Sequence, residues 1–186
     1  LTFFSVSMNG YSQINSHQLN NNLTTIQKKS NLPGFAVGII KNDSVIFSEG
    51  YGFADKKKRL PYTPETIQPI ASVSKTFIGF ALMEAVDLGY FTLETDINEI
   101  LPFKVINPNH PKDKIKIKDL ATHTSGLIDN DTTYIKAYCS GTKPSMELKT
   151  FLENYYLEGG KYYSKANFGN SEAGKEYKYS NIASSL

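Results

Sequence analysis

The sequence is poor in several residue types that particular functions need. Its 186 residues include no tryptophan, one cysteine, three histidines and a single arginine, Arg59, among twenty basic residues. Because Cys139 has no second cysteine to pair with, the fold cannot depend on an internal disulfide. Because the chain has so few histidine and cysteine side chains, and none at the paired spacing of metal ligands, we expect no metal site. We also expect no other cofactor. Without further Arg side chains for reading bases, we expect no nucleic-acid partner.

Long apolar runs are also missing. Beyond the first residues, no segment approaches the roughly 20 consecutive apolar residues of a membrane span, so we expect no transmembrane segment. Residues 1–8 are apolar and a polar stretch follows, which indicates the end of a signal-peptide core; the alternative is an N-terminal tail. We therefore expect residues 1–14 to be a signal remnant or tail, and the protein to be periplasmic or secreted. N-terminal sequencing of the mature protein, which should begin near Ile14, tests this expectation.

The first third of the chain is predicted to form one helix and a hairpin. Apolar residues at helical spacing predict the helix over residues 16–30, with Ser16 as its cap. Two apolar segments, 35–41 and 45–48, flank a short polar turn and predict an antiparallel pair of strands. Residues 15–65 therefore form a sheet-containing part.

The rest of the chain, residues 66–186, is predicted to be mostly helix and loop, which makes the whole an α+β architecture. The helix expected over residues 72–88 is apolar on nearly every face. Such a helix is typical of the middle of a protein rather than its surface. A further helix is predicted over residues 145–156.

Ser72 and Lys75 place a hydroxyl and an amine three residues apart at the start of this apolar helix. On a helix these positions share a face. A serine hydroxyl is a weak nucleophile until a neighbouring base takes its proton. Lysine is such a base when burial disfavours its ammonium form. The backbone N–H of Ser72, at the helix start, is free to bind an oxyanion.

The spacing alone leaves alternatives open. Seventeen serines and nineteen lysines make one or two Ser-x-x-Lys matches expected by chance, and a second match runs from Ser140 to Lys143. Ser72 could instead cap a helix while Lys75 reaches for solvent. Ser140 lies between the lone cysteine and a Gly/Pro-containing loop, whereas Ser72 opens the most apolar helix, so the context favours Ser72.

Tyr179 and Asn181 form the only Tyr-x-Asn pair in the sequence. A phenol near a lysine could move a proton between nucleophile and leaving group, and an asparagine amide could hold a substrate carbonyl. The alternative is a buried tyrosine with a hydrogen-bonded hydroxyl, followed by an asparagine that starts a helix.

Several stretches together resemble a known family. Ser-x-x-Lys is the nucleophile motif of β-lactamases and penicillin-binding proteins. Residues 70–77 (IASVSKTF) are similar to its form in class C β-lactamases, D-alanyl-D-alanine carboxypeptidases and related esterases. Further stretches of that group are matched, in the family's order, by residues 34–38 (GFAVG), 50–52 (GYG), 120–127 (LATHTSGL) and 174–181 (GKEYKYSN). The resemblance covers residues 17–186.

The resemblance implies a β-lactamase/transpeptidase-like fold, with an antiparallel sheet flanked by helices and a helical subdomain. It implies that Ser72 is acylated, that Lys75 assists as base, and that Tyr179 relays the proton. Asn181 would contact the substrate, and His123 would belong to a structural loop. The implied activity is hydrolysis through an acyl-serine intermediate. The substrate would be an amide or ester: a β-lactam, a D-Ala-D-Ala peptide of peptidoglycan or a small ester.

One part of the family's pattern has no match in residues 1–186. The family has a Lys or His followed by Thr or Ser and then Gly, on a strand that also gives the second oxyanion donor. No such triad occurs in a strand context here. We therefore expect these residues to be the N-terminal half of a domain that is incomplete at the C-terminus, and to be inactive alone. The alternative function is a non-catalytic acyl-binding or sensor domain, or an inactive fragment of such an enzyme.

Overall fold

The computed structural model describes residues 15–137, 144 and 146–186. The chain divides into two compact units, Leu1–Pro69 and Ile70–Leu186, and the sequence had placed this boundary between residues 65 and 66. The predicted signal remnant at residues 1–14 lies outside the described residues. So do Cys139 and the second Ser-x-x-Lys match, which starts at Ser140.

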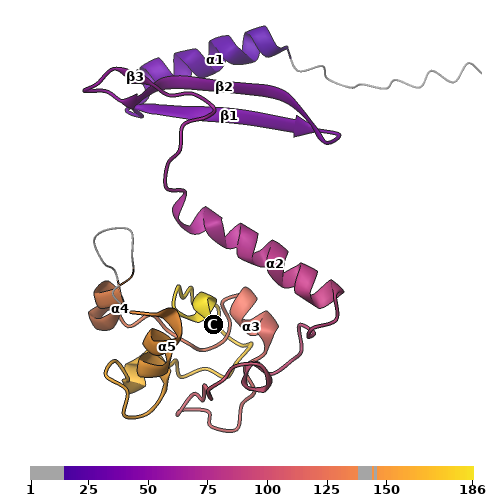
Figure 1. Ribbon diagram of the computed structural model, residues 1–186, viewed down its shortest axis with the longest axis vertical. Coiled ribbons are helices and arrows are strands. Elements are labelled where there is room, and N and C mark those ends of the chain that lie inside the picture. Colours follow the sequence, from indigo (N-terminus) through magenta and orange to yellow (C-terminus); the bar gives the residue numbers. More distant parts are fainter. Residues whose placement is uncertain (1–14, 138–143, 145) are drawn as a thin grey trace, which may run out of the picture. The chain divides into compact units, whose positions relative to one another are not determined.

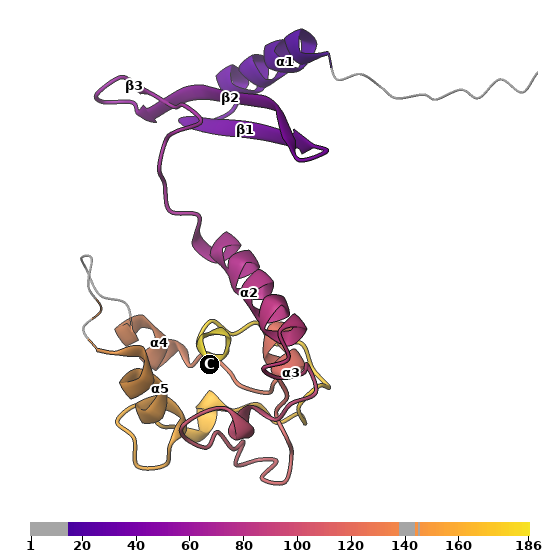
Figure 2. The same ribbon diagram turned by 45° about the vertical axis from the view of Figure 1, so that its right-hand side comes forward.

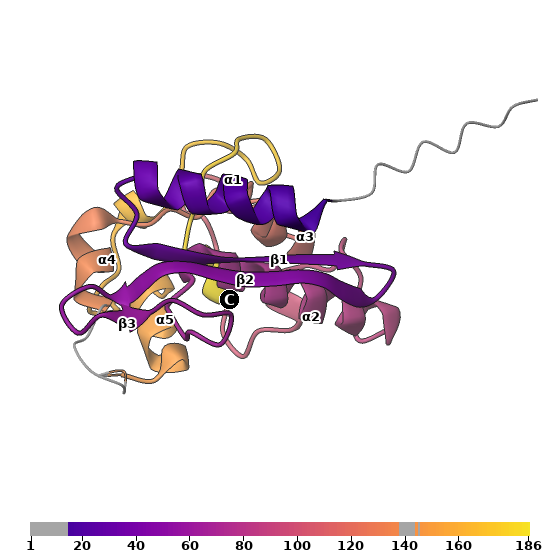
Figure 3. The ribbon, with the colours of Figure 1, turned by 90° about the horizontal axis from the view of Figure 1, so that it is seen from above.

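The first unit is a helix packed on a three-stranded antiparallel sheet. Helix α1 (Ser16–Lys29) precedes strands β1 (Gly34–Lys41), β2 (Ser44–Asp55) and β3 (Leu60–Pro61), which lie in the sheet order β1-β2-β3. α1 runs along one face of the sheet (Figure 3), and the Tyr51 hydroxyl of β2 donates a hydrogen bond to Asn20 Oδ1 at 2.7 Å. The cap of α1 is Asn15 rather than Ser16, because the Asn15 side chain accepts from the Gln18 backbone N–H at 3.0 Å.

The hairpin is longer than the sequence predicted. β1 and β2 join through Asn42–Asp43, where φ is +48° and +59°, as a two-residue turn of type I′ requires. β2 ends at Asp55 rather than at residue 48. Gly50 interrupts the apolar alternation but lies within β2. A glycine is needed at this position because a Cβ there would lie 2.2 Å from the Tyr62 carbonyl oxygen. The glycine therefore permits the close approach of the next segment.

The second unit holds the remaining helices, joined by long loops. They are α2 (Lys75–Asp87), α3 (Ile117–Ala121), α4 (Asp131–Ala137) and α5 (Leu148–Tyr156), with 3₁₀ turns η1 (Ala71–Ser74), η2 (Ile97–Glu99), η3 (Lys165–Asn167) and η4 (Ala183–Ser185). Within this unit, α4 and α5 lie on one side of the C-terminal turn and α3 on the other (Figures 1 and 2).

The core of the second unit gathers around α5, whose Leu152, Tyr155 and Tyr156 are buried. The other buried apolar side chains of this core are Ile97, Val105, Ile115, Leu127, Phe168, Ile182 and Ala183. A β-bridge between Leu127 and Phe168 joins two of the loops that supply them. Loops and 3₁₀ turns thus contribute seven of these ten core residues, and α5 contributes the other three.

α2 is apolar on nearly every face, yet it is exposed in this structure. Among the described residues none of its side chains is buried, and Phe77 and Phe80 are 66% and 70% exposed. A helix that is apolar all round needs neighbours on every side. Within the second unit, α2 borders an apolar cleft whose other walls come from the region of η2, from α3 and from the C-terminal turn. No helix of the described residues is both long enough and apolar enough to cross a bilayer.

Two neighbouring tyrosines of α5 give a matched stability test. The buried Tyr155 hydroxyl donates to the Ile128 carbonyl at 2.7 Å and accepts from the Asn130 N–H at 2.8 Å. The buried Tyr156 hydroxyl has no hydrogen-bond partner within the described part of the chain. Tyr155→Phe should lower the free energy of unfolding by about 1–3 kcal/mol, because it leaves two part-buried backbone groups without their partner, whereas Tyr156→Phe should be neutral or stabilising. Urea denaturation measures both, and equal losses would contradict this assignment.

Candidate active site

The hydroxyls of Ser72 and Tyr179 meet, although the two residues are 107 positions apart in the sequence. Their oxygens lie 2.8 Å apart, a hydrogen-bond distance. Ser72 belongs to η1, the 3₁₀ turn that leads into α2. Ala71, just before it, has a φ of +47°, in the left-handed region that costs energy for any residue with a side chain. Such strained residues cluster at functional sites, and this one precedes the predicted nucleophile.

Lys75 and Asn181 complete a four-residue network. One turn after Ser72, the Lys75 ammonium donates a hydrogen bond to Asn181 Oδ1 at 2.7 Å and lies 5.3 Å from the centre of the Tyr179 ring. The Tyr179 hydroxyl also lies 3.2 Å from the same Asn181 oxygen. The structure therefore brings all four predicted site residues together. Tyr179, rather than Lys75, makes the hydrogen bond to Ser72.

The electrostatics of this network make the Tyr179 phenol easier to deprotonate. Hydrogen bonding to Ser72, followed by hydrogen bonding to Lys75, lowers the pKa of the Tyr179 phenol below its usual value of 10. Burial and the negative charge of Asp129 oppose this shift. A phenol with a lowered pKa gives up its proton more readily, so it forms a proton acceptor closer to neutral pH.

His123 contacts the segment that carries Tyr179, and within the described residues no hydrogen bond joins it to Ser72. Its ring packs against the Tyr179 ring at 4.4 Å between centroids, and its Nδ1 accepts the Ser180 backbone N–H at 3.4 Å. Burial, followed by the positive charge of Lys75, lowers the pKa of His123 below 6.5. A neutral imidazole has the lone pair that the contact with Ser180 needs. By these contacts His123 supports the segment that carries Tyr179.

Asp129 is a polar residue of this site that the sequence did not single out. Its carboxylate accepts four hydrogen bonds from residues 180–182, which include Asn181 and flank Tyr179. It lies two residues beyond the stretch 120–127 that resembles the family, where no sequence signal marks it. Its role in the site is visible only from its partners, which lie 51–53 positions away.

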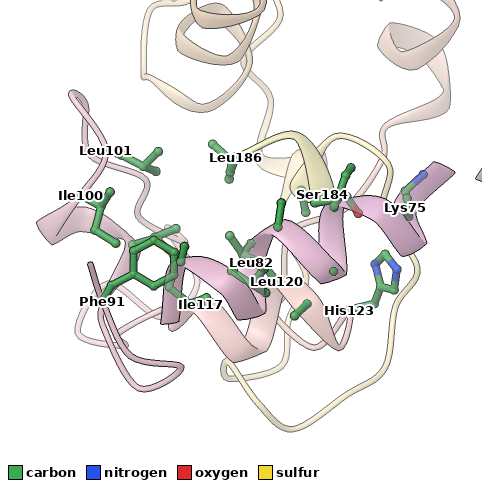
Figure 4. A pocket seen from close by; sticks show the side chains of 17 residues that line it. Lys75, Leu82, Phe91, Ile100, Leu101, Ile117, Leu120, His123, Ser184 and Leu186 are labelled. Carbon is green, nitrogen blue, oxygen red and sulfur yellow. The ribbon is translucent and has the colours of Figure 1, made fainter. Parts of the chain in front are cut away.

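An apolar cleft of about 430 Å³ runs beside α2 and ends at this network. Figure 4 shows Lys75 and His123 at one end and Phe91, Ile100 and Leu101 at the other. Its walls are mostly aliphatic and aromatic, and its polar side chains are Lys75 and His123 at the end near the network, and Ser184. We assign it to the packing of α2 rather than to substrate.

In the described residues, no three His, Cys, Asp or Glu side chains are grouped as metal ligands.

Comparison with known proteins gives the family. Residues 19–186 match the family model described as Beta-lactamase. This chain belongs to the β-lactamase family. It is 33% identical over 106 residues to Protein flp of Staphylococcus aureus (strain N315), covering 57% of this chain and 21% of that protein.

Two solved structures share the fold. One is EstCE1, a hydrolase with promiscuous acyltransferase activity, with a TM-score of 0.66 and 22% identity over 88% of this chain and 43% of that one. The other is the D-amino acid amidase of Ochrobactrum anthropi SV3 in complex with D-phenylalanine, with a TM-score of 0.61 and 23% identity over 89% and 43%. The chain thus has the predicted α+β fold of β-lactamase-like proteins. It spans about two fifths of these structures and about a fifth of its curated relative.

The hydrogen bond from Ser72 predicts a measurable shift in the titration of Tyr179. The ring carbon of ¹³Cζ-labelled tyrosine reports the phenol by NMR, and Tyr179→Phe identifies its signal. Ser72→Ala should raise the pKa of Tyr179, because it removes the largest cause of the lowered value. Ser74→Ala, in the same turn, should leave it unchanged. Identical Tyr179 titrations in the protein and in Ser72→Ala would contradict the hydrogen bond.

Proposed function

We propose that the protein is a serine hydrolase that cleaves an amide or ester through an acyl-serine intermediate at Ser72. The single observation that supports this most strongly is the 2.8 Å contact between the Ser72 and Tyr179 hydroxyls. Beside it, Lys75 binds Asn181 at 2.7 Å and contributes to the lowered pKa of the phenol. A nucleophile within hydrogen-bond reach of an activated acceptor, which is itself held by a third group, is the arrangement that acyl transfer needs.

In the proposed reaction, Ser72 passes its proton to Tyr179 as its oxygen bonds to the substrate carbonyl carbon. Among the described residues, no hydrogen bond occupies the Ser72 backbone N–H, which leaves it available for the oxyanion that forms. When the carbon–nitrogen or carbon–oxygen bond breaks, Tyr179 returns the proton to the leaving group. Water then hydrolyses the acyl-serine by the same route.

This proposal changes the division of roles that the family resemblance implied. Within the described residues, the Lys75 Nζ donates to Asn181 Oδ1 and makes no hydrogen bond to Ser72, whereas the Tyr179 hydroxyl does. Tyr179 is therefore the first acceptor, and Lys75 stabilises the phenolate. Asn181 holds Lys75 in place, and it remains the residue proposed to contact the substrate.

An amide or ester is the substrate class that we propose. The two solved relatives are described as a hydrolase with promiscuous acyltransferase activity and as a D-amino acid amidase, and their shared fold supports acyl chemistry of this breadth. A β-lactam, a D-Ala-D-Ala peptide and a small ester all present the carbonyl that the site would attack. Turnover of nitrocefin, a D-Ala-D-Ala dipeptide and a p-nitrophenyl ester separates these three possibilities.

The second candidate is a domain that is acylated at Ser72 but does not turn over. It concerns residues 1–186 taken alone, which do not contain the Lys/His–Thr/Ser–Gly triad expected to give the second oxyanion donor. Loss of one such donor lowers kcat by about 10²–10³. We therefore propose that residues 1–186 alone lack measurable turnover. The two candidates differ in the fate of the acyl group: a hydrolase releases it, and a sensor keeps it.

The test of the proposed function is covalent labelling of the protein expressed from its own gene. A fluorophosphonate probe should attach to Ser72, and Ser72→Ala should abolish labelling. Tyr179→Phe should slow labelling by about 10²–10⁴, the usual contribution of a positioned acid or base. Ser74→Ala, in the same turn, is the matched control and should label as the unaltered protein does. Labelling that persists in Ser72→Ala, or that maps to Ser140, would contradict the assignment of Ser72 as the nucleophile.

A further inference from the structure

We infer that Asp129 is a positioning residue, which orients the Asn181 amide so that its oxygen faces Lys75 and Tyr179. This inference rests on the proposed function, because it concerns the same site. Asp129 touches neither Ser72 nor Lys75 in any hydrogen bond of the described residues. It acts through Asn181, whose side chain lies between them.

The two carboxylate oxygens divide four donors between them. Asp129 Oδ1 accepts from the Ser180 hydroxyl at 2.7 Å and from the Ile182 N–H at 2.9 Å. Asp129 Oδ2 accepts from the Asn181 backbone N–H at 2.8 Å and from Asn181 Nδ2 at 3.0 Å. All four donors are neutral, so one negative charge is shared among N–H and O–H groups of a single short segment. Hydrogen bonds to a charged acceptor are roughly twice as strong as neutral ones.

The bond to Asn181 Nδ2 settles which way this amide points. An amide has one donor end and one acceptor end. Because Asp129 takes the NH₂ group, the oxygen must face the other way, where it meets the Lys75 ammonium at 2.7 Å and the Tyr179 hydroxyl at 3.2 Å. A flipped amide would set its NH₂ against the lysine and its oxygen against the carboxylate. Both contacts would then be repulsive.

Asp129 can serve as a fixed reference because the residues on either side of it are tied to the core. The Ile128 carbonyl accepts from the buried Tyr155 hydroxyl, and the Asn130 N–H donates to that same hydroxyl. Ile128 also donates its N–H to the Asn167 carbonyl at 2.9 Å, next to the bridge between Leu127 and Phe168. A carboxylate on a fixed segment can hold a partner to the tolerance that catalysis requires.

The inference predicts what an isosteric change does. In Asp129→Asn, the new amide oxygen can keep the Ser180 and Ile182 donors, but its NH₂ then faces two donors of Asn181. The Asn181 side chain should flip, which turns its own NH₂ toward Lys75. Labelling of Ser72 should slow by about tenfold to a hundredfold, the scale of a misplacement near 1 Å. Asp131→Asn, an exposed carboxylate at the start of α4, is the matched control and should label at the unaltered rate.

An exchange of the two groups separates orientation from general structural support. Asn181→Asp alone places two carboxylates against each other and should label slowly. In the double variant Asp129→Asn/Asn181→Asp, the new asparagine can donate to one oxygen of the new aspartate, whose other oxygen faces Lys75. The double variant should therefore label faster than Asn181→Asp. If it labels no faster, or if Asp129→Asn labels at the unaltered rate, Asp129 does not orient this side chain.

A measurement on the unaltered protein tests the inference independently of labelling, and it does not require that any variant folds. The side-chain amide signals of ¹⁵N-asparagine can be followed by NMR. One Asn181 amide proton should exchange slowly with solvent, because it is held by Asp129. Fast exchange of both protons overturns the inference. If the unaltered protein is not labelled at Ser72 and this proton is still protected, the proposed function fails while the orientation by Asp129 stands.

Discussion

The Tyr155 hydroxyl is the constraint on which the arrangement of the site depends. It bridges the Ile128 carbonyl and the Asn130 N–H, and burial raises its pKa to about 12, so it remains a neutral donor and acceptor at physiological pH. Asp129 lies between these two anchored residues and accepts hydrogen bonds from residues 180–182. The order of support therefore runs outward: α5 fixes residues 128–130, Asp129 fixes Asn181, and Asn181 receives Lys75 and Tyr179 beside Ser72.

This order explains why some residues of the site could be predicted and one could not. Ser72 with Lys75, and Tyr179 with Asn181, are pairs within one turn or one short segment, so their spacing is visible locally and matches a family pattern in the right order. Asp129 has no such signature, because an aspartate beside an asparagine after a Gly-containing loop is ordinary turn sequence. Its importance arises from partners more than fifty residues away, which only the folded chain brings to it.

The fold was predicted best where short-range patterns decide it. The α1 helix and the β1–β2 hairpin follow from periodicity and a two-residue turn. The sequence predicted β2 too short because Gly50 resembles a break in the strand. In the structure Gly50 lies within β2, and a glycine is needed there because Tyr62 approaches its backbone closely. The apolar sequence of α2 correctly indicates a helix that requires neighbours, but burial depends on which neighbours are present. Within the second unit, α2 borders the apolar cleft with one side, and Phe77 and Phe80 are exposed.

The central claim is that Ser72 is a nucleophile served by Tyr179 and Lys75. A crystal structure of the protein from its own gene, soaked with a phosphonate ester that mimics the tetrahedral intermediate, tests it most directly. The account predicts a covalent bond from phosphorus to Ser72 Oγ, with the Tyr179 hydroxyl within about 3.2 Å of the adduct and the Asn181 oxygen still bound to Lys75. An adduct on another side chain would contradict the account. So would a Tyr179 hydroxyl more than about 6 Å from Ser72 Oγ, which is beyond direct proton transfer.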